Sequence, residues 1–488
     1  MFFNSLEYAV FFPVVCILYY VMSDRIKKAY LLIVSYIFYM SWNPFYSLIM
    51  LFSTLTTFLC GIILDNVQKK HSRKLTLVSL LIINFGILFL FKYYSFFTTS
   101  LELLMNALGI STHIPSISLS LPLGISFYTF QAAGYTIDVY RRKVPAERDF
   151  VIYALFVSFF PQIASGPIQR SEQFIKQLKE SHKFDYNHVT LGLKIMAIGF
   201  FKKMVIADTL AEQVNLVYNQ IDINSAAVYI VATIFFAFQI YCDFSGYTDI
   251  AIGSAKVLGF DLVTNFDKPY FSCSIPEFWR RWHMSLSTWF RDYLYFPLGG
   301  NRVGKIKWYR NIMVVFLVSG LWHGANWTFV IWGIMHGGYQ VFGKMTLPMR
   351  KKLISISRLD HMTKVYSLIQ GIITFSLVCA AWVFFRANTV NDAFSIYGLV
   401  FKNITTLLNP RFFIDSLRFG LLRREPMLTC LLSIIFLLIY DAIDIKFGFW
   451  TLVGKMKPIF RIVFYVLLVF SFFWFMSTSS NEFIYAQF

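Results

Sequence analysis

Two histidines stand out because of the residues around them. His283 lies in residues 277–285 (EFWRRWHMS), and His323 lies in residues 319–325 (SGLWHGA), about forty positions further along. An ionisable side chain inside an apolar segment is costly unless it has a partner or a function. An imidazole also titrates close to working pH, which suits a general base. His323 is therefore the first candidate for acid–base chemistry.

Each histidine has two interpretations. Gly320 and Gly324 flank His323 within one helical turn, and we expect them to leave space for a ligand beside the imidazole, with Trp322 as an aromatic wall. The alternative for His323 is a structural histidine, hydrogen-bonded inside a helical bundle. His283 is either an interfacial anchor or a polar group that orients a substrate or acts as a second acid or base.

An arginine-rich stretch, residues 280–310, surrounds His283. Its charge is explained by membrane topology and by attraction to anionic lipids. The dense alternation of arginine and tryptophan at its start also suits binding of phosphate oxygens, because the guanidinium group matches their geometry. The candidate residues for binding an anionic acyl donor are Arg280, Arg281, Trp282 and Arg291.

A second polar group lies upstream, in residues 238–249 (FQIYCDFSGYTD). Carboxylates inside membrane segments are usually paired and functional. We expect Asp243 or Asp249 to pair with an arginine of the next segment, with Gln239 and Ser245 as further polar support.

Other kinds of site find no support in the sequence. The histidines, cysteines and carboxylates show no metal-ligand spacing, and the six cysteines are scattered without a disulfide framework. The sequence also has no Gly-rich phosphate loop in a strand–helix setting and no nucleophile-elbow serine. We expect no permanently bound cofactor or metal.

The composition indicates that these residues are positioned by membrane helices. Hydrophobic residues make up 57% of the 488 positions and charged residues only 14%. Apolar runs recur along the whole chain, and several reach the length of about 20 residues that crosses a bilayer. We expect an all-α, polytopic integral membrane protein with about a dozen transmembrane or re-entrant segments. The first apolar run lacks the basic start and small-residue cleavage site of a signal peptide.

The net charge of +18 is also explained by a membrane topology. The basic residues gather in short loops between apolar runs, as the positive-inside rule requires, so nucleic acid is not an expected partner. Basic clusters at 25–28, 69–74 and 141–143 alternate with loops that carry almost no base. The alternation places both termini outside a cytoplasmic membrane.

Two segments depart from simple alternation. Residues 150–166 are apolar but basic on both flanks, and they contain Pro161 and Gly166, so we expect a broken or re-entrant segment. Residues 311–322 and 326–342 lie between two basic regions and form a hairpin. A helix of about 12 residues rises only about 18 Å, so His323 at the hairpin tip is expected deep in the membrane, approached from the cytoplasm.

The rest of the chain indicates one membrane-embedded domain over residues 1–488. Residues 387–426 mix Phe, Leu and Arg, which favours helices lying in the outer interface. A transporter or flippase of a cell-envelope precursor, without covalent chemistry, would also contain broken segments and buried charges. The hydropathy shows no internal repeat, and this absence counts against the transporter alternative.

Four motifs together resemble the membrane-bound O-acyltransferase (MBOAT) family. They are residues 239–246, 269–271, 277–293 and 319–325, and the similarity is densest over about 120–345. The nearest branch is the alginate O-acetyltransferase-like group, which includes peptidoglycan and cellulose O-acetylation proteins and the teichoic-acid D-alanylation membrane protein. The resemblance implies many tilted helices around a central tunnel.

The resemblance also implies roles for individual residues. It makes His323 the catalytic residue and His283 the second signature polar position, with tunnel or polar support from Gln239, Asp243, Ser245, Trp322 and Asn326. It implies transfer of an acyl group, most simply acetyl, from acetyl-CoA or an acyl carrier protein to a hydroxyl of an extracytoplasmic polysaccharide. A separate extracytoplasmic acyltransferase is then expected to complete delivery, with membrane lipids surrounding the protein.

The C-terminal residues 483–488 (FIYAQF) resemble aromatic endings seen in this family and in the small partner peptide of the D-alanylation system, where a tyrosine is proposed as an acyl relay. Tyrosine forms covalent acyl intermediates when it is activated. Tyr485 is therefore a candidate relay, and the alternative is an aromatic anchor at the interface.

Overall fold

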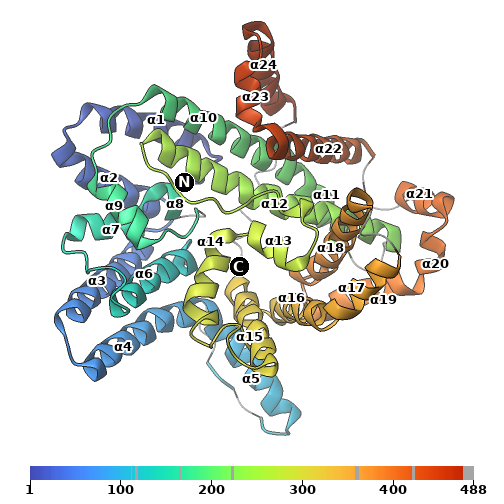
Figure 1. The fold of residues 1–488 in the computed structure, drawn as a ribbon, viewed down its shortest axis with the longest axis horizontal. Coiled ribbons are helices and arrows are strands. Elements are labelled where there is room, and N and C mark those ends of the chain that lie inside the picture. The colour runs from blue at the N-terminus through green and yellow to red at the C-terminus, as the bar shows by residue number, and fades with distance from the viewer. Residues whose placement is uncertain are drawn as a thin grey trace.

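The computed structural model describes residues 1–111, 113–115, 119–163, 166–220, 225–357, 362–419, 422 and 424–475. Helices are the regular elements throughout these residues, and no strand occurs among them. Figure 1 shows the helices around a centre occupied by α12, α13 and α14. The expectation of an all-α fold is confirmed for this part of the chain.

Most of the N-terminal third lies at the left of Figure 1, and α5 lies at the bottom, below α15. Asn43 caps α3 by accepting from the amide of Phe45, and Pro44 occupies the first turn, where its missing N–H costs nothing. The elements are α1 Leu6–Val21, α2 Asp24–Met40, α3 Pro44–Asn66, α4 Lys70–Leu88, the π-helix η1 Phe89–Tyr93, α5 Tyr94–Ala107 and α6 Ile125–Tyr140.

The predicted re-entrant segment is broken in the structure. It consists of α7 Phe150–Ser158 and the single turn α8 Phe160–Ile163, which are separated at Phe159, where the backbone leaves the helical conformation (φ −51°, ψ 114°). Nearly every residue of α7 and α8 is buried in protein, so the interrupted backbone is covered, as membrane depth requires. The amphipathic helix α9, Ser171–Lys179, follows.

The central helices are α10 Tyr186–Phe200, the π-helix η2 Phe201–Ala207, α11 Asp208–Tyr218 and α12 Ala226–Val257. Glycines let α10 and α12 touch through their backbones: a Cβ on Gly199 would lie 2.7 Å from the Gly246 carbonyl oxygen, and one on Gly192 would lie 2.7 Å from that of Gly253. Small residues at helix contacts are the usual basis of close packing in membranes.

The histidine motifs lie on short helices and on a hairpin. The short elements are the 3-10 turn η4 Pro269–Phe271, α13 Ile275–Arg281, α14 Met284–Phe290 and the π-helix η5 Arg291–Tyr295. The hairpin consists of α15 Lys305–His323 and α16 Trp327–Met345. The prediction of a hairpin is confirmed, but α15 begins six residues earlier than expected. Its 19 residues rise about 28 Å, so helix length no longer argues for the depth of His323.

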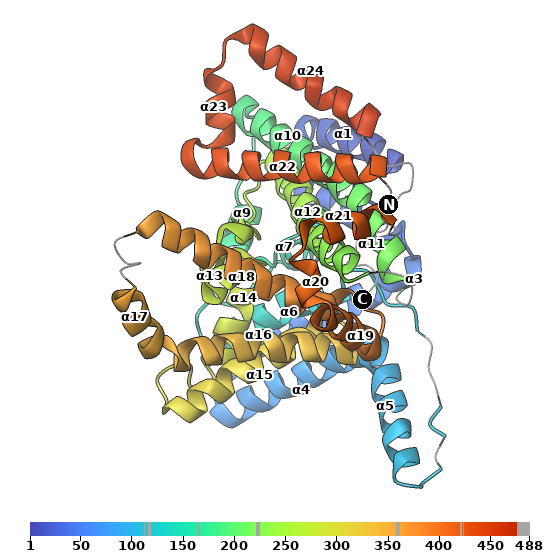
Figure 2. The same cartoon turned by 90° about the vertical axis from the view of Figure 1, so that its right-hand side faces the viewer.

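The remaining helices complete the periphery. Figure 2 shows α22, α23 and α24 stacked at the top, away from α15 and α16. Helices were expected over 387–426, and α19, α20 and α21 occupy most of that segment. The elements are α17 Leu347–Ile356, α18 Thr363–Arg386, α19 Val390–Lys402, α20 Ile404–Leu407, α21 Pro410–Phe419, α22 Arg424–Phe447, α23 Phe449–Lys455 and α24 Pro458–Phe475.

The described helices fit a membrane by length and composition. Five are long and apolar enough to cross a bilayer: Pro44–Asn66, Lys70–Ala107, Ala226–Val257, Thr363–Arg386 and Met427–Phe447. Shorter apolar helices cover Leu6–Val21, Phe150–Ile163 and Pro458–Phe472. Peripheral helices expose large apolar side chains, whereas many buried positions are polar or charged. This distribution is the one that lipid as a solvent favours.

Candidate active site

His323 is the last residue of α15, and its side chain is buried among three helices. The residue is only 2% exposed. The imidazole meets Trp332 of α16 edge-on at 4.9 Å between ring centroids and Phe385 of α18 at 5.3 Å. The burial of His323 within the protein therefore comes from the packing of these helices.

The space that a side chain would take at the glycines beside His323 is filled by the facing helix, although Gly324 also lines the polar cavity described below. A Cβ on Gly320 would lie 2.3 Å from the carbonyl oxygen of Phe329, and a Cβ on Gly324 would lie 2.2 Å from the Phe329 ring. On the facing helix, a Cβ on Gly333 would lie 2.3 Å from the carbonyl oxygen of Phe316. The expectation is wrong here, because these glycines allow α16 to approach α15 closely and so fix the hairpin.

The C-terminal end of α15 is held by η1, a segment that the sequence analysis did not single out. Lys92 Nζ donates to the carbonyl oxygens of Trp322 at 2.7 Å and His323 at 3.2 Å. The Tyr93 hydroxyl donates to the carbonyl oxygen of Leu321 at 3.0 Å. A cation is favourable at a helix C-terminus, where carbonyls lack helical partners. Short π-helical segments are frequent at functional sites.

His283 lies between α13 and α14 in a strained conformation. Its φ of +41° is rare for a residue other than glycine, and strain of this kind clusters at functional sites. The residue is 1% exposed. Neither ring nitrogen has a hydrogen-bond partner within the part of the chain that the structure describes. Two unsatisfied nitrogens in a buried imidazole are costly, which favours a polar ligand beside this ring.

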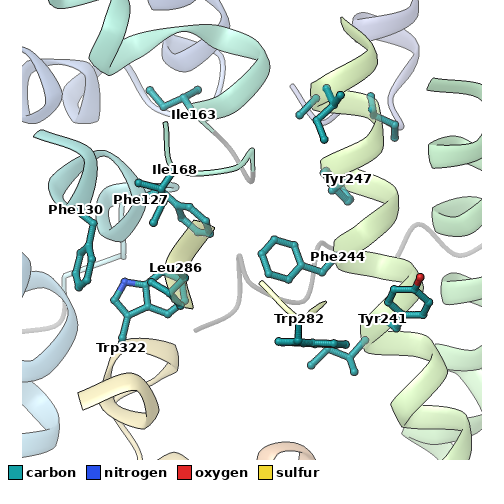
Figure 3. Close-up of a cluster of buried hydrophobic side chains, with 14 of the residues drawn as sticks. Phe127, Phe130, Ile163, Ile168, Tyr241, Phe244, Tyr247, Trp282, Leu286 and Trp322 are labelled. Carbon is teal, nitrogen blue, oxygen red and sulfur yellow. The ribbon is translucent and has the colours of Figure 1, made fainter. Parts of the chain in front are cut away.

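Trp322 connects the two histidines. Its ring lies 5.5 Å from the His283 ring and 5.0 Å from the His323 ring, measured between centroids. The other side of His283 meets Phe244 of α12 at 4.7 Å. In Figure 3, Trp322 lies with Phe127 of α6 on one side of the cluster, and Phe244 lies with α12 on the other. Aromatic side chains thus enclose both imidazoles.

A polar cavity of about 670 Å³ reaches the hairpin tip that carries His323. Gly324 and Asn326 of the tip line it, together with Lys92. Arg386 also lines the cavity and donates to the Asn215 side chain at 2.7 Å. Further polar lining residues are Lys203, Asp208, Asn219, Gln239, Asp243, Thr328 and Asn388. The cavity offers many hydrogen-bonding groups at the hairpin tip that follows His323.

The carboxylates of α12 pair with lysines. Lys203 Nζ lies 2.7 Å from Asp243 and 2.8 Å from Asp208, and Lys202 Nζ lies 2.8 Å from Asp249. The expectation of an arginine partner from the next segment is wrong, since both partners come from η2, upstream in the chain. The sequence signal for these ion pairs was the dipeptide Lys202-Lys203 in an otherwise apolar run, because a cation in such a run needs a carboxylate partner.

A third buried histidine was missed. His336 of α16 is fully buried, and its Nδ1 accepts a hydrogen bond of 3.2 Å from Trp279 Nε1. Its ring meets Trp332 at 4.9 Å, and Trp332 also meets His323. The signal was present in the sequence, because His336 lies in the same apolar segment as the hairpin.

Comparison with known proteins agrees with the motifs. The sequence profile of the MBOAT, membrane-bound O-acyltransferase family, matches residues 38–387. The chain belongs to the MBOAT family.

Relatives of known class cover most of the chain. A probable alginate O-acetylase of Pseudomonas putida is 38% identical over 396 residues, covering 80% of this chain and 78% of that protein. A peptidoglycan O-acetyltransferase of Helicobacter pylori is 35% identical over 429 residues, covering 81% and 79%. A teichoic acid D-alanyltransferase of Bacillus subtilis is 32% identical over 238 residues, covering 46% and 59%. The protein is thus a membrane O-acyltransferase.

The structure separates the four residues expected to bind the acyl donor in this MBOAT protein. Trp282 is fully buried and packs between Phe278 and Trp382. Arg280 and Arg291 are exposed. Arg281 pairs with Glu277 at 2.9 Å, and Arg291 pairs with its neighbour Asp292 at 2.9 Å. Trp282 therefore belongs to the aromatic interior, whereas the arginines belong to the surface.

The supporting residues have different surroundings. Gln239 lines the polar cavity, and its Oε1 has no hydrogen-bond partner among the described residues. Asn326 also lines the cavity, and its side chain caps α16 by accepting from the Thr328 amide at 3.0 Å. Ser245 is buried one turn beyond Tyr241 on α12. Tyr485, the candidate relay, lies outside the described residues.

Proposed function

We propose that this MBOAT protein moves an acetyl group from a cytoplasmic thioester across the membrane for O-acetylation of an extracytoplasmic polysaccharide. The observation that carries the proposal is the place of His323. It ends α15 inside an aromatic enclosure shared with His283, and the next residues of the hairpin tip, 324–326, line a wide polar cavity. The alginate and peptidoglycan O-acetylating relatives support acetyl as the group and a glycan as the final acceptor.

The chemistry assigned to His323 is general-base catalysis. An acceptor hydroxyl in the polar cavity approaches the imidazole, which removes its proton as the oxygen attacks the thioester carbonyl. The new C–O bond forms, the C–S bond breaks, and the proton passes from the imidazole to the leaving sulfur. The products are an ester and a free thiol, so atoms and charge balance without a metal or a cofactor as a reactant.

The aromatic side chains around His323 provide a water-excluding environment for this step. Trp322, Trp332 and Phe385 surround the imidazole and exclude bulk water. Excluding water strengthens electrostatic interactions and protects the thioester from hydrolysis. His283 would then orient the thioester or share the proton, since its two nitrogens have no other described partner.

The two faces of the protein divide the substrates in this proposal. The arginine-rich segment 280–310 faces the cytoplasm by the positive-inside rule and binds the anionic part of acetyl-CoA or an acyl carrier protein through Arg280, Arg281 and Arg291. The polar cavity faces outward, toward the acceptor. The termini lie outside, and Tyr485 or a separate extracytoplasmic acyltransferase receives the acetyl group before the polysaccharide does.

The decisive experiment uses the purified protein in proteoliposomes with a labelled acetyl thioester and a soluble acceptor. The wild-type protein should release free thiol and label the acceptor. His323→Ala should slow thiol release by about 10²–10⁴-fold, the usual contribution of a positioned general base. Unchanged thiol release in a folded His323→Ala protein would remove His323 from the chemistry. Acceptor delivery without thiol release would favour transport.

A further inference from the structure

Phe385, near the C-terminal end of α18, is in contact with both His323 and the polar cavity. Its ring lies 5.3 Å from the imidazole, measured between centroids, and it also lines the cavity. Trp322 and Trp332 meet the imidazole as well, but neither of them lines the cavity. His323 itself does not line the cavity and is 2% exposed. Phe385 therefore forms part of the wall that separates the cavity from the imidazole.

Phe329 of α16 belongs to the same wall. It lines the cavity and meets Phe385 edge-on at 4.8 Å between ring centroids. The backbone of the hairpin holds it in place: a Cβ on Gly324 would lie 2.2 Å from its ring, and a Cβ on Gly320 would lie 2.3 Å from its carbonyl oxygen. Phe329 cannot turn aside unless the hairpin opens, because packed backbone fills the space beside it.

The surroundings of Phe385 allow a movement that those of Phe329 do not. The Phe385 ring packs against other side chains, with Trp332 at 5.3 Å and Trp382 at 5.1 Å between centroids. On its other side lies the polar cavity of about 670 Å³. The backbone beside the ring is held, since Arg386 donates to Asn215 of α11 at 2.7 Å. A change of rotamer can therefore turn the ring into the cavity while α18 keeps its place.

We propose that Phe385 is a gate between the thioester at His323 and the acceptor in the polar cavity. In its closed position the ring keeps the water of the cavity away from the imidazole. When an acceptor enters the cavity, the ring turns aside and the acceptor hydroxyl reaches the imidazole. This inference rests on the proposed function, and it gives Phe385 the selection of an acceptor hydroxyl over water as the nucleophile.

The gate has a chemical purpose because water can undergo the same reaction as the acceptor. The imidazole of His323 would remove a proton from water as the water oxygen attacks the thioester carbonyl. The new C–O bond forms, the C–S bond breaks, and the proton passes to the leaving sulfur. The products are acetic acid and a free thiol, so the acetyl group is lost without transfer. Closing a site against water prevents this kind of side reaction.

The test measures acetate, acetyl ester and free thiol in proteoliposomes supplied with a labelled acetyl thioester, with and without a soluble acceptor. Wild type should form mostly ester with the acceptor and little acetate without it. Phe385→Ala should raise the ratio of acetate to ester several-fold, because water then reaches the thioester. Phe385→Leu keeps part of the side-chain volume and should give an intermediate ratio, and it tests the gate even if the alanine variant does not fold.

The matched control is Phe384→Ala. Phe384 is the neighbouring residue of α18 and is 3% exposed, but its ring packs against Phe394 and Tyr397 of α19 and does not line the cavity. This variant loses a buried aromatic ring, as Phe385→Ala does, yet its ratio of acetate to ester should remain that of wild type. An equal rise in both alanine variants overturns the inference, as does an unchanged ratio in Phe385→Ala and Phe385→Leu.

A second measurement does not depend on turnover. Diethyl pyrocarbonate modifies accessible imidazoles, and mass spectrometry of the peptide that contains His323 gives the rate of its modification. The rate should be low in wild type and in Phe384→Ala and higher in Phe385→Ala. Equal rates in the three proteins overturn the gate. Faster modification in Phe385→Ala without thiol release by any of the proteins would support the gate and count against the proposed function instead.

Discussion

The ammonium of Lys92 lies 3.2 Å from the carbonyl oxygen of His323, although 231 positions separate the two residues in the chain. The same ammonium donates to the carbonyl oxygen of Trp322 at 2.7 Å, so one side chain of η1 holds the end of α15 where the hairpin tip begins. A helix C-terminus with its carbonyls satisfied by a cation is a rigid support.

Lys92→Met should therefore have a larger effect on the kcat of acetyl transfer than on the free energy of unfolding. We expect a loss of about 10–100-fold in kcat, as for a charged hydrogen bond that positions a reacting group. Lys92→Arg should restore part of the rate, because it keeps a cation at the helix end. Tyr93→Phe is the matched control: it removes the bond to Leu321 alone, and its effect should be smaller. Equal kcat in all three proteins would reduce Lys92 to a lipid-side anchor.

His283 can be tested through its left-handed backbone. Asparagine tolerates positive φ better than alanine does. His283→Asn should therefore unfold at a higher temperature than His283→Ala, while both variants transfer acetyl slowly. Thermal unfolding in detergent and thiol release measure the two effects separately. Wild-type turnover by His283→Asn would show that only the backbone geometry matters at this position.

The ion cluster of Lys203, Asp208 and Asp243 gives a stability prediction. Lys203→Met leaves two carboxylates without their cation, and we expect a loss of about 3–5 kcal/mol, typical of breaking a buried ion pair. Adding Asp208→Asn and Asp243→Asn to that variant should recover much of the loss, because no uncompensated charge then remains. Denaturant or thermal unfolding of the three proteins checks the order. A triple variant that is less stable to unfolding than Lys203→Met would contradict this prediction.

Close packing between α15 and α16 predicts opposite effects for two glycines of α16. Gly333→Ala places a Cβ against the Phe316 carbonyl and should destabilise the hairpin by about 1–3 kcal/mol. Gly338→Ala meets nothing within 4 Å and should be neutral or stabilising by up to about 1 kcal/mol. Thermal unfolding separates the two. Two equal shifts would mean that the helices do not meet as closely as described.

The tail gives the last prediction. Tyr485→Phe keeps the aromatic ring and removes only the hydroxyl, so it should block delivery of the acetyl group to the glycan if Tyr485 relays it. Intact-mass analysis should detect an acetyl adduct on the tail of wild type and none on that of the variant. Full glycan acetylation by Tyr485→Phe would assign the relay to a partner protein.

Sequence reasoning succeeded where the cause was local. The hairpin of α15 and α16 was expected from two apolar runs between basic regions, and the break near Phe159 was expected from the prolines and glycine around it. It failed where the cause was tertiary. Lys92 cannot be read as a cap of α15 from positions 89–93, and Lys203, the partner of Asp243, lies in η2, upstream of α11. Gly320 was misjudged because a glycine in sequence does not say whether a ligand or a neighbouring helix occupies the space beside it.

The backbone contacts of the glycines divide the protein mechanically. Gly199 against Gly246 joins α10 to α12, and Gly320 against Gly333 joins α15 to α16. Helices that touch through backbone atoms cannot slide or rotate past each other without a clash. Each pair of helices therefore moves as one rigid body. Any widening that admits a substrate to the histidines must occur at the aromatic contacts between the two helix pairs, where side chains can change rotamer without separating packed helices.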